Sequence, residues 1–205
     1  MTEPAAMQLP LFDLRDRRVL VLGLGGSGAA MARWAARQGA IVRVADSRPQ
    51  PPGLDALRAS GLDLPVERTD FDPAVLDGAD LVAWSPGLSI EAGPSGALHA
   101  EAQRRELQVV GELELFSQAI CSLPGETSPP RVLAVTGTNG KTTVTAMAAA
   151  LCRASGLSAR AAGNIGPSLL EALMDAIDTD ELPQVWVIDL SSFQLALAQR
   201  FTVDA

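Results

Sequence analysis

The amino-acid sequence predicts an α/β protein built from two consecutive parallel-sheet units. Short, continuously apolar strands alternate with helices, which is typical of a parallel sheet covered by helices on both faces. Two blocks also begin in the same way, with an apolar strand, a glycine-rich turn and a helix, at residues 18–38 and 132–154. We therefore expect a Rossmann-like domain over residues 1–111 and a second, incomplete α/β domain over residues 112–205.

The elements of the first domain follow from its apolar runs and from glycine and proline turn signals. The expected order is strand 18–22, glycine-rich turn 23–28, helix 29–38, strand 41–45, helix 53–60, strand 81–84 and turn 85–87. A helix over 112–119 and the loop-like segment 122–130 follow at the expected domain junction.

The second domain is expected to repeat the same alternation. The order is strand 132–135, a loop of small residues, helix 144–154, loop 163–166, helix 168–175, strand 184–189 and a short helix beginning near Ser192. Alternating strands and helices of this kind again favour a parallel sheet.

Composition and charge narrow the class of protein. Of the 205 residues, 47% are hydrophobic and 20% are charged, which is ordinary for a chain with a packed core. The formal net charge of -8 argues against a nucleic-acid-binding surface. No apolar run approaches the ~18 residues that span a bilayer. The N-terminus also lacks the pattern of a secretory signal, so we expect a cytoplasmic protein.

Three residues of types that often carry chemistry are expected to be structural. Cys121 and Cys152 have no CxxC spacing and no nearby histidine, which favours unpaired thiols. His99 is the only histidine, and its polar surroundings predict a solvated position on a helix.

The only lysine of the chain lies in a glycine-rich loop, whereas the other 15 basic residues are arginines. Such a loop, between a buried strand and a helix, exposes backbone N–H groups at the positive end of the helix dipole. Gly137 and Gly140 allow the backbone to approach an anion, Lys141 would reach terminal phosphates, and the Thr142 hydroxyl would face Mg²⁺. The segment 136–143 (TGTNGKTT) therefore predicts a P-loop-type site for the phosphates of ATP.

Asp189 ends the apolar strand 184–189. Ligands meet parallel sheets at the carboxyl ends of the strands, and a carboxylate there is suited to bind Mg²⁺ or to position water. The sequence also fits a structural role, in which Asp189 is the N-cap of the helix that begins near Ser192. We favour the metal role.

The first block carries a second glycine pattern. Gly23, Gly25 and Gly28, with Asp46 at the end of the next strand, match the dinucleotide-binding fingerprint. The pattern predicts a phosphate-bearing ligand on the helix that begins near Ser27. An NAD-dependent oxidoreductase and a catalytically silent nucleotide-binding module are therefore alternatives. The ATP loop in the next block, and the short segment between the blocks, argue against the dehydrogenase.

The order of these motifs resembles that of the Mur ligase family over nearly all of residues 18–200. Val135 departs from the strict GxxxxGK[ST] pattern, and the loop is instead similar to that of Mur ligases and folylpolyglutamate synthases. The similar segments are GLGGSG at 23–28, DSR at 46–48, SPG at 85–87, GELELF at 111–116, TGTNGKTT at 136–143, GNIG at 163–166 and LSSFQL at 190–195. Asn139, which is histidine in L-alanine-adding members, and LSSFQL, which the folate relatives lack, favour the D-glutamate-adding members.

The resemblance implies a reaction and a set of binding residues. ATP and Mg²⁺ would serve to phosphorylate the carboxylate of UDP-N-acetylmuramoyl-L-alanine, and the amine of D-glutamate would attack the acyl phosphate, in peptidoglycan precursor synthesis. The implied UDP-substrate residues are Gly26, Ser27, Asp46, Ser47, Arg48, Ser85, Gly87 and Asn164. The implied ATP residues are Gly137, Thr138, Asn139, Gly140, Lys141, Thr142 and Thr143. Lys141 and Asp189 would be catalytic, and Thr142 and Asp189 would bind Mg²⁺.

The sequence also departs from the family pattern. Position 189 is usually glutamate in the family, so Asp189 is one methylene shorter than the expected metal ligand. Later family motifs and a C-terminal domain that closes over ATP are expected beyond Ala205. We therefore expect the 205-residue chain to be a catalytically incomplete monomer, with strand 184–189 at an uncovered sheet edge.

Overall fold

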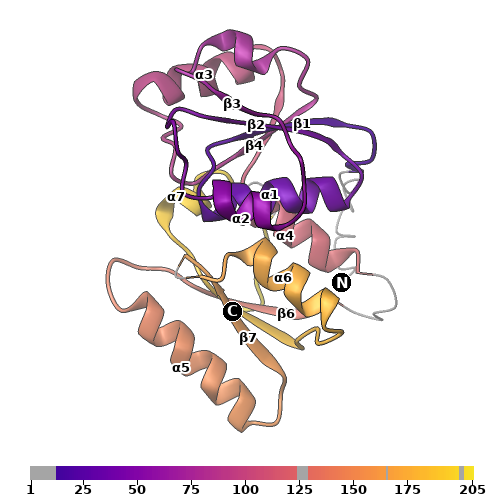
Figure 1. Ribbon diagram of the computed structural model, residues 1–205. Coiled ribbons are helices and arrows are strands. Elements are labelled where there is room, and N and C mark those ends of the chain that lie inside the picture. Colours follow the sequence, from indigo (N-terminus) through magenta and orange to yellow (C-terminus); the bar gives the residue numbers. More distant parts are fainter. Residues whose placement is uncertain (1–12, 124–128, 165, 199–200) are drawn as a thin grey trace, which may run out of the picture.

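The computed structural model describes residues 13–123, 129–164, 166–198 and 201–205. The expected loops 122–130 and 163–166 lie partly outside the described residues. Figure 1 shows two sheets in separate layers, with helices between them and on their outer sides. The α/β class expected from the sequence is confirmed.

The first sheet has five parallel strands in the order β3-β2-β1-β4-β5. They are β1 (Arg18–Leu22), β2 (Ile41–Asp46), β3 (Val66–Arg68), β4 (Leu81–Trp84) and β5 (Gln108–Val110). The chain moves outward from β1 to β3 and then returns to the other side of β1 with β4. Ligands of doubly wound sheets bind outside the carboxyl ends of the strands at such a reversal. The Rossmann-like arrangement is therefore confirmed, and it places a crevice between β1 and β4.

Helices cover both faces of this sheet. Figure 1 shows α1 (Gly26–Arg37) and α2 (Leu54–Ala59) on the side of the second sheet and α3 (Gly93–Arg104) on the outer side, and the short helix η1 (Pro73–Leu76) lies between β3 and β4 in the chain. Helix α1 begins three residues before the expected helix 29–38, because the end of the glycine-rich turn itself forms the first helical turn.

The second sheet has three parallel strands in the order β6-β8-β7. They are β6 (Arg131–Val135), β7 (Ala159–Gly163) and β8 (Val185–Asp189). Helix α5 (Lys141–Ala154) packs against β7 and β8, and α6 (Leu169–Asp178) lies on the side of the first sheet (Figure 1). The identification of this unit as a P-loop-type ATP-binding domain stays a prediction.

The expectation that strand 184–189 has an uncovered edge is wrong. Strand β8 is the central strand of the sheet, and the crossover through α6 inserts it between β6 and β7. The outer side of β6 is also hydrogen-bonded to the last two residues of the chain. The Asp204 N–H donates to the Val132 carbonyl at 2.9 Å, and the Ala134 N–H donates to the Ala205 carbonyl at 2.9 Å.

Helix α4 (Glu112–Cys121) lies at the junction of the two sheets and packs against α1 and α6. One buried hydrophobic cluster includes Val21 of the first sheet, Phe116 of α4 and Trp186 of the second sheet. The rings of Phe116 and Trp186 meet edge to face, with centroids 5.2 Å apart. Because this core is continuous across residue 111, the expected boundary between two domains there stays a prediction.

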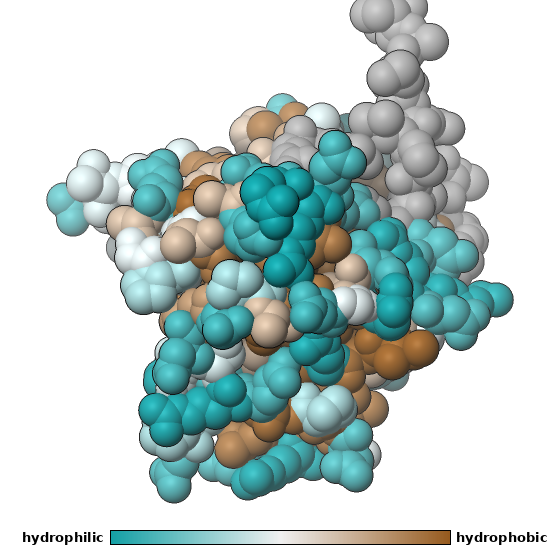
Figure 2. All heavy atoms as spheres, turned by 90° about the horizontal axis from the view of Figure 1, so that it is seen from above, coloured by the Kyte–Doolittle hydropathy of each residue, from teal (hydrophilic) through white to brown (hydrophobic). Residues whose placement is uncertain are grey.

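The outer side of the first sheet is mostly hydrophilic, with hydrophobic side chains in small groups (Figure 2). His99 of α3 is not solvated as expected: it is half-buried, and its ring meets that of Trp84 at 5.3 Å. Burial lowers the pKa of His99. Cys121 and Cys152 are both free thiols, as expected. None of the helices in the described part of the chain has the length and apolar character needed to cross a membrane.

Candidate nucleotide-binding sites

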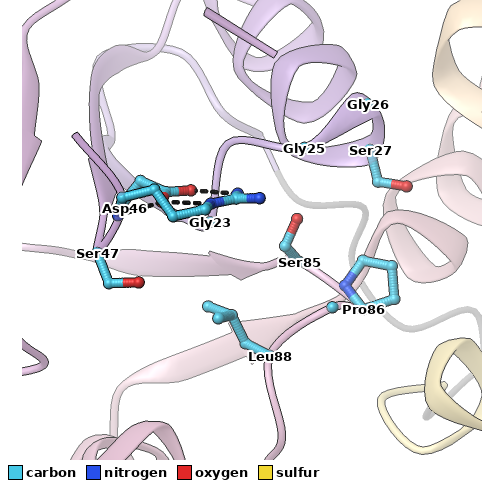
Figure 3. A pocket seen from close by; sticks show the side chains of 11 residues that line it. Gly23, Gly25, Gly26, Ser27, Asp46, Ser47, Ser85, Pro86 and Leu88 are labelled. Atoms are coloured by element: carbon cyan, nitrogen blue, oxygen red, sulfur yellow. Dashed lines mark hydrogen bonds and ion pairs between the residues drawn. The ribbon is translucent and has the colours of Figure 1, made fainter. Parts of the chain in front are cut away.

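A cavity of about 390 Å³ lies at the carboxyl ends of β1, β2 and β4, where the strand order reverses (Figure 3). Its lining residues are Gly23, Gly25, Gly26, Ser27, Asp46, Ser47, Arg48, Ser85, Pro86, Gly87 and Leu88. Seven of the eight residues expected to hold the UDP substrate, all but Asn164, are thus brought together from three loops. Leu88 was not among the expected residues; it directly follows the expected turn 85–87 and lines the cavity with it.

Two glycines allow β1 and α1 to approach closely at this cavity. Gly23 has a φ of +83°, which favours glycine. A Cβ atom on Gly28 would lie 1.9 Å from the Gly23 carbonyl oxygen, so no other residue fits without a backbone shift. The first turn of α1 carries no acidic residue, and its N-cap, Gly25, has no side chain that could cap the helix. The helix therefore presents its positive end to the cavity, which suits a phosphate.

Asp46 forms the wall of the cavity opposite α1 and is only 3% exposed. Its carboxylate accepts four hydrogen bonds: from the Leu24 N–H at 2.6 Å, and from the Arg48 N–H, Nε and Nη2 at 2.8, 2.9 and 2.7 Å. Dashed lines mark the side-chain bonds at Asp46 in Figure 3. Burial acts to raise the pKa of Asp46, but the bonds from Arg48 and Leu24 outweigh it, and the pKa lies below its usual value.

Asn164 does not line this cavity. It is exposed and follows β7, at the carboxyl edge of the second sheet. Its backbone N–H donates to the Asp189 carbonyl at 2.9 Å. The ends of β7 and β8 approach this closely because residue 163, directly before Asn164, is glycine. A Cβ atom on Gly163 would lie 2.3 Å from the Asp189 carbonyl oxygen.

The expected phosphate loop connects β6 to α5 at the same edge. Gly137 and Gly140 have φ values of +145° and +76°, and Gly140 is the N-cap of α5. The loop is exposed, and the Lys141 Nζ donates to the Gly137 carbonyl at 2.8 Å. Helix α5 begins at Lys141, three residues before the expected helix, so Lys141 and Thr142 lie in its first turn. The structure thus places the expected ATP residues at a helix N-terminus without acidic residues.

Asp189 lies beside this loop, at the carboxyl end of the central strand. It is opposite Val135 of β6 and Gly163 of β7, and its side chain is fully buried. Neither carboxylate oxygen has a hydrogen-bond partner among the described residues, and the same holds for the buried hydroxyl of Thr145 in α5. Because a buried carboxylate without partners is costly, the site is chemically incomplete as it stands.

The alternative role of Asp189 as a helix N-cap is wrong. Helix α7 (Ser192–Leu195) is capped by Ser191, whose Oγ accepts from the Gln194 N–H at 3.3 Å. In return, the Gln194 Oε1 accepts from the Ser191 N–H at 2.9 Å. This reciprocal pair is a capping box. It leaves the Asp189 carboxylate available for another partner.

The carboxylate of Asp189 is a hard oxygen ligand of the type that Mg²⁺ prefers. Over the described ranges of the chain, no three histidine, cysteine or acidic side chains gather as a metal-binding cluster. A cation at Asp189 would therefore need further oxygen ligands from hydroxyl groups and from a bound nucleotide, as is usual for Mg²⁺ in phosphoryl-transfer enzymes. The residues present fit such a site, and their role in metal binding stays a prediction.

Known proteins similar to this chain show which family it belongs to. Residues 17–111 match the family model described as "Mur ligase MurD-like, N-terminal domain". The UDP-N-acetylmuramoylalanine–D-glutamate ligase of Bordetella pertussis is 53% identical over 193 residues, which are 91% of this chain and 38% of that protein. The ligase of the same name from Paraburkholderia xenovorans is 51% identical over 194 residues, 93% of this chain and 38% of that protein.

Among solved structures, UDP-N-acetylmuramate–alanine ligase from Thermotoga maritima is 23% identical, with a TM-score of 0.42 over 70% of this chain and 30% of that chain. The chain spans about two fifths of the length of the curated relatives, at 38% in both cases given above. Identity of about one half over nine tenths of the chain, together with the domain match, identifies the family: this chain belongs to the MurD-like Mur ligases, and residues 17–111 correspond to their N-terminal domain.

Proposed function

We propose that this protein contributes the UDP-substrate site and the ATP-phosphate site of an ATP-dependent ligase. The ligase would add D-glutamate to UDP-N-acetylmuramoyl-L-alanine, in the cytoplasm and as a monomer, during peptidoglycan precursor synthesis. One observation carries the proposal. The motif residues gather at the carboxyl edges of two parallel sheets, one with a lined cavity and one with a phosphate loop beside a buried, unpartnered carboxylate.

The cavity of the first sheet would hold the UDP part of the substrate. The N-terminus of α1 and the glycine-rich turn suit the diphosphate, and the Arg48 guanidinium adds a positive charge to the wall. In NAD-binding proteins an acidic residue at the end of the second strand accepts hydrogen bonds from ribose hydroxyls. Here the four bonds to Asp46 use the acceptor sites of its carboxylate, so it is not free for ribose. This arrangement argues against the ribose contact that is usual in NAD-binding proteins.

The edge of the second sheet would hold ATP with Mg²⁺. The loop and the N-terminus of α5 would bind the phosphates, and Lys141 would exchange the Gly137 carbonyl for a terminal phosphate oxygen. Asp189 would hold the cation, which neutralises phosphate charge when bound. The two acceptor oxygens of Asp189 would then gain the partner that they lack.

The proposed reaction has two steps. The substrate carboxylate attacks the γ-phosphorus of ATP and forms an acyl phosphate, with ADP as the leaving group. The amine of D-glutamate then attacks the acyl carbon, and inorganic phosphate leaves as the amide forms and the amine loses a proton. Both steps need positioning and charge neutralisation rather than a covalent protein nucleophile, which agrees with a site made of a loop, one lysine and one carboxylate.

Calorimetry on the 205-residue chain tests the proposal. UDP and UDP-N-acetylmuramoyl-L-alanine are expected to bind, whereas NADH at the same concentration is not. Heat protection gives a second reading, since a ligand at a hundredfold excess over its Kd stabilises the folded protein by about 2.7 kcal/mol. NADH binding without binding of either uridine compound would contradict the proposal and favour an oxidoreductase.

A further inference from the structure

Trp84 is a fully buried residue that directly precedes the turn 85–87 of the first cavity. It is the last residue of β4 and belongs to the hydrophobic cluster on the outer side of the first sheet, with Leu98 and Ala102 of α3. Its ring also meets the ring of His99 edge to face. The position of the indole is therefore set by the core of the first sheet and not by the cavity.

The indole N–H of Trp84 donates to the Leu88 carbonyl at 3.1 Å, a normal hydrogen-bond distance. It is the one hydrogen-bond donor of a tryptophan side chain. The Leu88 N–H in turn donates to the Ser85 carbonyl at 3.0 Å, which closes the turn. The backbone of Leu88 is thus held at both its N–H and its carbonyl, once by the turn itself and once by a side chain of the core.

Leu88 forms part of the wall of the first cavity, on the same side as Ser85 and Pro86 (Figure 3). Its side chain packs against the glycine-rich turn, since a Cβ atom on Gly23 would lie only 3.2 Å from the Leu88 Cδ1. Leu88 also lines a second cavity of about 210 Å³, together with Phe193 of α7. A shift of Leu88 would therefore change the packing of the glycine-rich turn and the shape of both cavities.

We propose that Trp84 is a positioning residue for the UDP-substrate site: its indole N–H fixes Leu88, and with it the cavity wall that follows β4. This inference rests on the proposed function for the identity of the ligand, whereas the hydrogen bond that carries it does not. Trp84 itself lines neither of the two cavities. It acts on the site through Leu88.

Trp186 provides a matched control for the loss of the indole N–H. It is also fully buried in a strand, and its ring meets that of Phe116 edge to face, as the ring of Trp84 meets that of His99. Its Nε1 has no hydrogen-bond partner among the described residues. Replacement by phenylalanine removes the same atoms from a core at either position, but it removes a hydrogen bond only at position 84. A comparison of the two variants therefore isolates the effect of that bond.

Titration of UDP into the wild-type chain and into both variants tests the effect on binding. Trp84→Phe is expected to weaken UDP binding about fivefold, which corresponds to about 1 kcal/mol, the usual net contribution of one hydrogen bond. Trp186→Phe should change the affinity by less than about twofold, since it removes no hydrogen bond. Because Trp84 acts through Leu88, adding Leu88→Ala should weaken binding by a smaller factor in Trp84→Phe than in the wild type. In Trp186→Phe it should act by the same factor as in the wild type.

Hydrogen exchange measured by NMR tests the positioning of Leu88 without any ligand. The Leu88 N–H should exchange about fivefold faster in Trp84→Phe than in the wild type, because the turn opens more often, and at an unchanged rate in Trp186→Phe. In the wild type, the indole N–H resonance of Trp84 should shift when UDP is added, and that of Trp186 should not. This last measurement needs no substitution at position 84, so it decides the inference if Trp84→Phe does not fold.

The outcomes are distinguishable. An unchanged UDP affinity in a folded Trp84→Phe protein, or an equal loss of affinity in both variants, would overturn the inference. Equal exchange rates of the Leu88 N–H in Trp84→Phe and in the wild type would overturn it as well. If the wild-type chain binds no uridine compound, the proposed function fails. The exchange rate of the Leu88 N–H then still decides whether Trp84 holds the turn.

Discussion

Each of the two sheets carries a buried aspartate at its carboxyl edge, and the structure surrounds these two side chains in opposite ways. Asp46 of the first sheet is 3% exposed and accepts four hydrogen bonds within the protein. Asp189 of the second sheet is fully buried, and its carboxylate accepts none from the described residues. Both lie where ligands of parallel sheets bind. The first carboxylate is therefore bound within the protein, whereas the second has no hydrogen-bond partner among the described residues.

This difference indicates two kinds of binding site. The first cavity is formed before its ligand arrives, because close backbone packing at Gly23 and Gly28 and the Asp46–Arg48 pair fix its walls. We propose that the second site is completed by its ligand, because the Lys141 ammonium is hydrogen-bonded to the loop and the Asp189 carboxylate has no partner in the described chain. Ligand-free stability should therefore depend on the first set of residues and not on the second.

The largest expected effect comes from filling the space between β1 and α1. Gly28→Ala would place a methyl group 1.9 Å from the Gly23 carbonyl oxygen, where backbone lies on both sides. We expect the free energy of unfolding to fall by about 3 kcal/mol or more. Gly26→Ala is the control, since its methyl group meets nothing within 4 Å. Equal effects of the two substitutions in urea unfolding would show that the cavity walls are not held by this contact.

Lys141→Ala tests the second site by ligand affinity. The ammonium group is expected to bind a terminal phosphate, and loss of such a charge-assisted contact costs about 1.5–3 kcal/mol, or roughly ten- to a hundredfold in affinity for Mg·ATP. Arg153→Ala is the control, because Arg153 is a basic residue in the last turn of the same helix. Calorimetry should show weaker Mg·ATP binding for Lys141→Ala alone, with UDP binding unchanged. A Mg·ATP affinity equal to that of the wild type would contradict the phosphate-loop assignment.

Asp46→Asn should destabilise the ligand-free protein. The substitution weakens the hydrogen bonds from Arg48 and from the buried Leu24 N–H. We expect a loss of about 1.5 kcal/mol in the free energy of unfolding, at the low end of the range for bonds to charged groups. The low end applies because Arg48 is half-exposed and solvent weakens its bonds. The pKa of Asp46 is lower in the folded state than its usual value. Its stabilising effect is therefore complete above the unfolded pKa of ~3.9 and is lost as the pH falls below it. Urea unfolding should show a large difference in the free energy of unfolding between Asp46→Asn and the wild type at pH 7, and a small difference at pH 3. A difference that does not shrink at pH 3 would contradict this account.

Local sequence signals were sufficient for much of the fold. Continuous apolar runs predicted β1, β2, β4, β6 and β8, and the glycine patterns indicated at which strand ends the candidate sites lie. The three-residue strands β3 and β5 are too short to show a period, and β7 is rich in alanine rather than in β-branched residues. Each of these three strands forms an edge of its sheet.

The rest of the candidate sites depends on contacts between residues far apart in the chain. The motif at 23–28 could be recognised from its spacing, whereas the pairing of Asp46 with Leu24 and Arg48 needed side-chain positions. The sequence left open whether Asp189 or a neighbouring residue caps α7. The structure shows that Ser191 caps it. Glu112 belongs to a motif that was recognised, but its contacts lie 58 residues away at Leu170. No local sequence pattern predicts a contact between residues so far apart in the chain.

The most direct test of the difference between the two sites is the free energy of unfolding of Asp189→Asn, with and without Mg·ATP. Without ligand, the variant should be as stable as the wild type or more stable, because an amide is less costly than a carboxylate in a buried position without partners. With Mg·ATP at a hundredfold excess over its Kd, the wild type should gain about 2.7 kcal/mol, and the variant should gain little at the same concentration. A variant that is destabilised without ligand, or that gains as much from Mg·ATP as the wild type, would contradict the account.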